Sequence, residues 1–259
     1  MKKWRNLYLS LVFIVLYVPI FYLIFYSFNK AGDMQAFTGF TFSYYQELFS
    51  DHRLLHIVLQ TFLLAFLSSL IATAIGVFGA IYLEKLRQKK QQWLLNANNI
   101  LLVSPDVIIG ASFLIFFTFL GMKLGFVSVL LSHIAFSIPI VVVMVLPKVQ
   151  EMPQSLVDAA ADLGATPWQT LIHVMLPYLT PSIIAGYFMA FTYSLDDFAV
   201  TFFVTGNGFT TLAVEIYSRA RQGISLEINA LSTLIFFFSL FLVIGYYFIS
   251  RYDHQGGKK

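Results

Sequence analysis

Six long apolar runs constrain the fold of this chain more than any other feature of its sequence. They lie near residues 7–28, 57–83, 94–120, 126–146, 182–204 and 228–250. A helix needs about 20 apolar residues to cross a bilayer, and each run is of about that length. Lipid cannot satisfy backbone polar groups, so a spanning segment of this length must be helical. We therefore predict an all-α integral membrane protein, with one domain over residues 1–259 and six transmembrane helices.

The composition supports a membrane class. Charged residues make up 11% of the 259 residues and hydrophobic residues 58%, whereas soluble domains carry roughly 25% charged residues. The mean hydropathy is +0.77. Aromatic rings such as those of Trp4, Tyr82 and Trp93 stand at the ends of runs, where amphipathic rings meet lipid headgroups.

The first run follows the charged start Met1-Lys2-Lys3-Trp4-Arg5, which is similar to a secretory signal. Its apolar stretch is longer than the roughly 7 to 15 residues of a signal, and no small-x-small cleavage site follows before Asn29. We expect it to remain as the first span. The chain has no cysteine, which excludes disulfides and thiolate metal sites.

Lysine and arginine predict the orientation. With both termini in the cytoplasm, eleven of these residues lie inside and five outside, as the positive-inside rule requires. The net charge of +3 is then explained by the lysines and arginines at the cytoplasmic side. The sequence has no stripe of basic residues that would indicate nucleic-acid binding. His52 and His56 have the spacing of metal ligands but lack a third ligand, so no metal is predicted.

A polar segment, residues 147–181, separates the fourth and fifth runs. Ser155 and Asp158 have capping-box spacing, which predicts a short helix with Asp158 in its first turn. Gly164 fits a left-handed position at the end of that helix, and Thr166-Pro167 reads as the cap and first residue of a second one. Three alanines, 159–161, leave the first helix thin enough for a partner surface to approach. These helix-capping signals alone are also compatible with a connector that binds no partner.

The spacing of this segment resembles a known motif. Asp158-Ala159-Ala160 is followed after three residues by Gly164, and after nine more by Val174, one residue and Leu176-Pro177. This resembles the signature loop of permeases of ABC importers, with Asp in place of Glu and Val in place of Ile. The resemblance implies a type I importer permease in which 158–164 is the coupling helix, seated in a cytoplasmic ATPase. The residues it assigns to ATPase coupling are Asp158, Ala159, Ala160, Asp162, Gly164, Leu176 and Pro177.

The same resemblance implies partner chains. The sequence has no Gly-x-x-x-x-Gly-Lys-Ser/Thr phosphate loop, so it is not the ATPase. ATP and Mg would be held by a cytoplasmic dimer of ATP-binding cassettes, and this chain would bind no cofactor and perform no covalent chemistry. A second, homologous permease and an external binding protein would complete the importer. We expect it in the bacterial inner membrane.

Two adjacent carboxylates, Asp196 and Asp197, end the fifth run. A charged side chain within a span costs about 2.5 to 3.5 kcal/mol on insertion scales, so neither should face lipid. On a helix Tyr193 and Asp197 share a face while Asp196 points about 100° away, so one acid can face a pathway while the other braces it. Equally, both acids can cap a helix or pair with the sister permease.

The surrounding sequence narrows the substrate. Tyr193-Ser194-Leu195-Asp196-Asp197-Phe198, together with Ser104-Pro105-Asp106 and the residues up to Gly110, resembles the spermidine/putrescine permease family of ABC importers. That resemblance implies a polyamine substrate, with Tyr193, Asp196 and Asp197 in the pathway. The alternatives are a permease for iron, sulfate, phosphate or thiamine, and an ATP-independent channel or secondary carrier. A membrane enzyme is disfavoured because no catalytic constellation is present.

Overall fold

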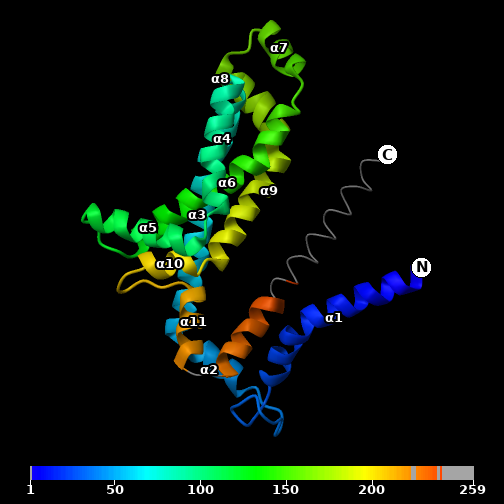
Figure 1. Cartoon of the computed structure of the whole chain (residues 1–259), viewed down its shortest axis with the longest axis vertical. Coiled ribbons are helices and arrows are strands. Elements are labelled where there is room, and N and C mark those ends of the chain that lie inside the picture. The colour runs from blue at the N-terminus through cyan, green and yellow to red at the C-terminus, as the bar shows by residue number, and fades with distance from the viewer. Residues whose placement is uncertain (1, 223–225, 238–239, 241–259) are drawn as a thin grey trace. The chain divides into compact units, whose positions relative to one another are not determined.

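The structure is a computed structural model that describes residues 2–222, 226–237 and 240. In this part of the chain the regular elements are helices, beside one isolated bridge between Asn29 and Phe40 (Figure 1). They are α1 (Lys2–Tyr26), α2 (Ser43–Ser50), α3 (His52–Glu84), α4 (Gln88–Val103), α5 (Asp106–Phe119), α6 (Phe126–Gln150), α7 (Gln154–Asp162), α8 (Pro167–Thr170), the π-helical turn η1 (Leu171–Met175), α9 (Leu176–Asp196), α10 (Ala199–Val204), α11 (Leu212–Gln222) and an unlabelled helix, Leu226–Phe237. The predicted all-α class is confirmed.

Four helical stretches of the described chain are long and apolar enough to cross a membrane. They are Tyr8–Tyr26, His52–Glu84, Phe126–Gln150 and the continuous helix Pro167–Asp196. A fifth span is reached if the bent pair α4 and α5 counts as one. The sixth run, 228–250, begins within the shorter apolar helix Leu226–Phe237, and most of it lies outside the described residues. The count of six therefore stays a prediction.

The third run is not the one continuous helix that 94–120 suggests. It contains the end of α4 and all of α5, which are bent by 103° relative to each other. Ser104 and Pro105 lie between them with extended backbone, at ψ 139° and 132°. Proline has no N–H to give to the preceding turn and disfavours helical geometry in the residue before it, so the helix ends here.

The fifth run also differs from its predicted bounds, 182–204. Its helix begins much earlier, at Pro167, so part of the segment 147–181 is continuous with the span. It ends at Asp196, and Asp197 is extended with ψ 118° before α10 begins at Ala199. The acid pair therefore lies at a break between two helices.

Residues 57–215 form one compact unit, and the remaining residues form a second. In the first unit α6 and α9 run side by side as a long hairpin (Figure 1), and α10 packs beside α5. A glycine also permits α3 to approach α6 closely: a Cβ added to Gly76 of α3 would lie 2.7 Å from Val141 Cβ of α6. One apolar core surrounds Val141, Val145 and Leu179, and a second surrounds Ile109, Val129 and Val200.

The second unit contains the segment that follows α1. The buried amide of Asn29 donates to the carbonyls of Asp33 and Ala36 and accepts from the N–H of Thr38, which closes the loop. Further along, Arg219 contacts Asp51 at 2.9 Å and Glu227 at 3.1 Å. The hydrogen bond from Arg219 holds the pKa of Asp51 below its ordinary value.

Candidate functional site

The predicted coupling segment is residues 147–181. The first helix that lies wholly within it is α7, and the start of this helix differs from the prediction. The helix begins at Gln154, directly after Pro153, and no side chain caps it. Ser155 thus lies inside the helix, and Asp158 lies in its middle, where it accepts a hydrogen bond from Gln154 Nε2 at 3.1 Å. The predicted capping box at Ser155 was wrong, because Pro153 is the residue before the helix and the boundary therefore lies two residues earlier.

The end of α7 agrees with the prediction for Gly164. Its φ of +78° is left-handed. The Gly164 N–H donates to the carbonyl of Ala161, and the Ala165 N–H donates to that of Ala160. These two bonds form the Schellman motif, which places a left-handed residue after a helix end and favours glycine there.

The second helix of the segment begins as predicted. The Thr166 hydroxyl accepts from the Gln169 N–H, the Gln169 side chain accepts from the Thr166 N–H, and Pro167 is the first helical residue. The helix then widens through η1, where the Leu176 N–H donates to the carbonyl of Leu171. The π-helical turn lies directly before the Leu176-Pro177 pair, whose proline has no N–H to donate to the turn before it.

The residues predicted to contact an ATPase gather around α7. Figure 1 shows α7 at the tip of the α6–α9 hairpin, at the end away from α5 and α10. Asp158, Ala159, Asp162 and Gly164 are exposed there, while Ala160 is buried. Leu176 packs against the core around Val141, and Pro177 is exposed at the start of α9. Contact between these residues and an ATPase stays a prediction.

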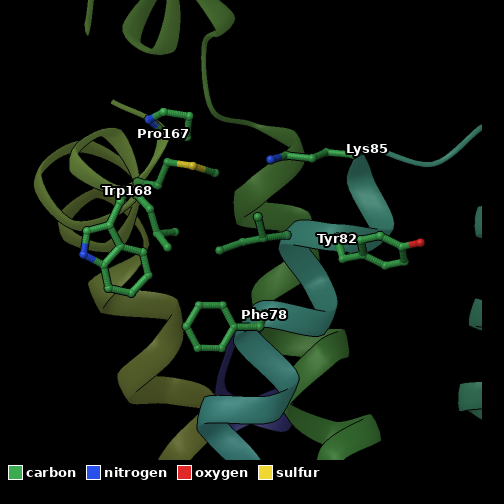
Figure 2. Close-up of a pocket in the computed structure, with 8 residues that line it drawn as sticks. Phe78, Tyr82, Lys85, Pro167 and Trp168 are labelled. Carbon is green, nitrogen blue, oxygen red and sulfur yellow. The ribbon is translucent and has the colours of Figure 1, made fainter. Parts of the chain in front are cut away.

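A pocket of about 440 Å³ lies beside this segment. It is lined by Phe78, Ile81, Tyr82, Lys85, Pro167, Trp168, Leu171 and Met175. Figure 2 shows Trp168 and Phe78 approaching the same space from two different helices. Its lining is mainly apolar and includes none of the residues predicted to contact substrate.

The acid pair is divided by the break after α9. Asp196 is exposed at the last position of the helix. The Asp197 carboxylate has 7% of its side chain exposed and accepts from the N–H of Val200 at 3.2 Å and from the N–H and hydroxyl of Thr201 at 2.8 and 2.7 Å. Asp197 therefore caps α10, and Asp196 is the carboxylate free to meet a solute.

Tyr193 lies one turn before the break. Its hydroxyl donates to Asp106 Oδ1 at 2.9 Å, which joins α9 to the first turn of α5. Asp106 and Asp196 are both exposed, and the ring of Tyr193 is 38% exposed. Two helix breaks, after Val103 and after Asp196, thus present carboxylates near one aromatic ring. Together these groups can bind an elongated cation through ion pairs and cation–π contacts.

His133 of α6 is a functional candidate that the sequence reasoning missed. It is fully buried and contacts Ser194 of α9, Thr201 of α10 and the carboxylate of Asp197. The signal was present, because an ionisable residue inside an apolar run of a membrane protein is itself a functional hypothesis. The sequence places Asp106 at a helix start but assigns it no partner, because Tyr193 is distant in sequence and only the fold brings the two together.

Comparison with known proteins identifies a family. Residues 72–254 match the family described as the binding-protein-dependent transport system inner membrane component. The chain is 34% identical over 251 residues to the spermidine/putrescine transport system permease protein PotC of Haemophilus influenzae, covering 97% of this chain and 98% of the relative. It is 35% identical over 252 residues to PotC of Escherichia coli K12, covering 97% and 96%.

A further relative and a solved structure are also similar to this chain. The putrescine transport system permease protein PotI of Escherichia coli K12 is 34% identical over 244 residues, with 90% of this chain and 86% of the relative covered. A crystal structure of a bacterial ABC transporter for import of the acidic polysaccharide alginate superposes with a TM-score of 0.74 at 16% identity, covering 96% of this chain and 95% of that one. This similarity shows a shared fold.

Proposed function

Because the chain belongs to the family of binding-protein-dependent transport system inner membrane components, we propose that it is a permease subunit of an ATP-driven importer of the polyamines spermidine and putrescine. It forms half of the translocation pathway. The observation that carries the substrate assignment is the exposed Asp196 at a helix break close to Tyr193. The names of the PotC and PotI relatives support the same substrate class.

The chemistry of a polyamine fits this arrangement. Spermidine and putrescine are flexible chains whose amines are protonated at neutral pH, and an ammonium group binds a carboxylate by a charge-assisted hydrogen bond. An aromatic face adds a cation–π contact of about 0.5 to 2 kcal/mol. Asp196 and Asp106 supply exposed carboxylates, and Tyr193 supplies the ring. A neutral solute would form no ion pair with these groups, and an anionic solute would be repelled by the carboxylates.

The energy for import comes from another chain in this proposal. ATP and Mg are bound by a cytoplasmic dimer of ATP-binding cassettes, into which α7 docks with Asp158, Ala159 and Gly164. Closing and reopening of that dimer moves α7, and the rigid α6–α9 hairpin transmits the motion to the break at Asp196. The chain itself is non-catalytic. A second homologous permease completes the pathway, and both termini lie in the cytoplasm.

A polyamine-binding protein delivers the substrate on the opposite side of the membrane. This partner is supported by the family description, which names binding-protein-dependent transport. A solved alginate transporter of the same fold has been crystallised in complex with an alginate pentasaccharide-bound periplasmic protein. The partner in the present case must present a cation instead of an acidic sugar.

Uptake of labelled spermidine tests the proposal. Cells lacking this chain are compared with cells in which it is restored, each before and after ATP depletion with the proton gradient maintained. We expect restored uptake that disappears when ATP is depleted. Uptake that survives ATP depletion would identify a channel or secondary carrier. No gain on restoration would move the substrate to another class, such as iron, sulfate, phosphate or thiamine, which the same cells can be screened for.

A further inference from the structure

A buried polar cluster joins four helices around His133. The ring of His133 is fully buried in α6. Its Nδ1 lies 2.7 Å from the hydroxyl of Ser194, which lies 3.0 Å from the hydroxyl of Ser68 on α3. Its Nε2 lies 2.8 Å from the hydroxyl of Thr201 and 3.4 Å from Asp197 Oδ2. The cluster thus contacts both sides of the break between α9 and α10.

The hydrogen bonds fix which ring nitrogen is the donor toward the break. Thr201 gives its single hydroxyl hydrogen to Asp197 Oδ2 at 2.7 Å. A hydroxyl has one hydrogen to donate and accepts through its lone pairs. In the contact between Thr201 and His133, Nε2 must therefore carry the hydrogen. A directed chain results, from His133 Nε2 through the Thr201 hydroxyl to the carboxylate of Asp197.

The cluster also reaches the groups that face the pathway. The ring of Phe136, one turn after His133, lies 4.8 Å from the His133 ring and 5.0 Å from the ring of Tyr193, which it meets edge to face. Ser194 directly follows Tyr193 in the chain. His133 is thus linked to Tyr193 through the ring of Phe136, and to Asp197 through the Thr201 hydroxyl. The His133 ring itself is buried and does not meet a solute.

We propose that His133 is the positioning residue of the pathway: its Nε2–H holds Thr201 and Asp197, fixes the break after α9, and thereby places Asp196 and Tyr193 for an ammonium group. The inference rests on the proposed function only for the identity of the solute. Its physical basis is that buried polar groups within a membrane protein need their partners. Losing this donor leaves the Thr201 hydroxyl, which itself donates to the Asp197 carboxylate, without one of its hydrogen bonds.

Three substitutions separate positioning from simple packing. Glutamine places an N–H about as far along the side chain as Nε2, whereas asparagine reaches only as far as Nδ1, and leucine fills space without hydrogen bonding. We therefore compare His133→Gln, His133→Asn and His133→Leu in the complete transporter. His52, an exposed histidine at the start of α3, provides the control His52→Leu.

Two readouts are measured, each corrected for the amount of assembled transporter. The first is spermidine uptake, resolved into KM and maximal rate. The second needs no substrate. This chain has no cysteine, so Asp196→Cys gives it a single thiol, and the rate at which maleimide labels this chain reports the exposure of the break. This second readout is repeated in each His133 background.

The expected pattern is specific to the donor at Nε2. The Asn and Leu variants should raise the KM for spermidine by at least about tenfold, equivalent to 1.4 kcal/mol, and change the labelling rate severalfold. The Gln variant and the His52→Leu control should keep a KM and a labelling rate close to those of the unsubstituted transporter. A Gln variant as defective as Leu, or labelling unchanged in all three, would overturn the inference. If the unsubstituted transporter takes up no spermidine, the proposed substrate fails, and the labelling pattern still decides the role of His133.

Discussion

At the scale of single residues, neighbouring carboxylates at 196 and 197 lie in different environments. Asp196 is exposed and has room to meet a solute, whereas the Asp197 side chain is 7% exposed and accepts three hydrogen bonds from Val200 and Thr201. Neutralising each should therefore produce different defects. The two positions form their own matched pair, because each substitution removes one negative charge at nearly the same place in the chain.

We expect Asp196→Asn to raise the KM for spermidine by about fivefold, since a carboxylate–ammonium pair near the surface contributes about 1 kcal/mol. The amount of folded chain should not change. Kinetics of uptake in cells, with the amount of chain in the membrane measured in parallel, check this prediction. An unchanged KM would remove Asp196 from the pathway.

Asp197→Asn should instead reduce stability. Amide replacement loses bonds to a charged acceptor that contribute about 1.5 to 3 kcal/mol each, and the cap of α10 depends on them. Thermal unfolding of the purified transporter in detergent, together with its yield, tests this. A variant with normal stability and only a raised KM would show that Asp197 meets the solute directly.

The sequence predicted part of this site. It located the acid pair and Tyr193, and it offered, as one of two alternatives, that one acid faces outward while the other braces the helix. It did not show which acid is exposed and which braces the helix, because that depends on where α9 ends. The comparison of helical faces assumed that the helix continues through Asp197. Partners such as Asp106 and His133 are distant in sequence from the groups they contact, so only the fold reveals them.

At the scale of helices, the left-handed Gly164 sets the end of α7. Replacing it by valine should strain the backbone by about 1 to 2 kcal/mol, because Cβ disfavours positive φ, although no atom would contact the new Cβ. Gly164→Asn is the matched control, since asparagine tolerates this conformation better. We expect the valine variant to lower co-purification with the ATPase and substrate-stimulated ATP hydrolysis, and the asparagine variant to lie closer to normal. Equal co-purification and ATP hydrolysis in the two variants would mean that coupling does not depend on the left-handed backbone at residue 164.

Packing between α3 and α6 offers a matched pair of glycines, Gly76 and Gly79. A Cβ on Gly76 would lie 2.7 Å from Val141, whereas one on Gly79 would lie 3.8 Å from Val142. Gly76→Ala should therefore destabilise the hairpin region by about 1 to 3 kcal/mol through overpacking, and Gly79→Ala should be tolerated. Thermal unfolding of the two variants in detergent measures the difference. Similar stability of both would contradict the close approach at Gly76.

Local signals predicted some boundaries of these helices and missed others. Thr166-Pro167 and Gly164 were correctly assigned, because caps and left-handed turns depend on residues only a few positions apart. The breaks at Ser104-Pro105 and at Asp197 were missed as span boundaries because apolar length alone joined the segments on either side. Proline chemistry explains the first break. The second depends on hydrogen bonds between Asp197 and residues that follow it, and on the buried His133 of another helix.

At the scale of the whole molecule, the chain is a membrane permease whose larger compact unit, residues 57–215, contains the α6–α9 hairpin. The predicted coupling helix α7 lies at one end of this hairpin, and the break that carries Asp196 lies at the other end of α9 (Figure 1). Apolar run lengths and the spacing of the signature loop were sufficient to predict the class and the family. A packed hairpin of this kind can transmit movement because closely packed helices shift as rigid bodies.

The most direct test of this account is transport in vesicles that contain the complete transporter. Internal labelled spermidine is measured after adding its loaded binding protein, with or without ATP on the side of α7, for the unsubstituted chain and for Asp196→Asn. The account predicts ATP-dependent accumulation by the unsubstituted chain, a raised KM in the variant, and no accumulation of labelled sulfate or thiamine. Accumulation without ATP, or equal KM values for the two chains, would contradict it.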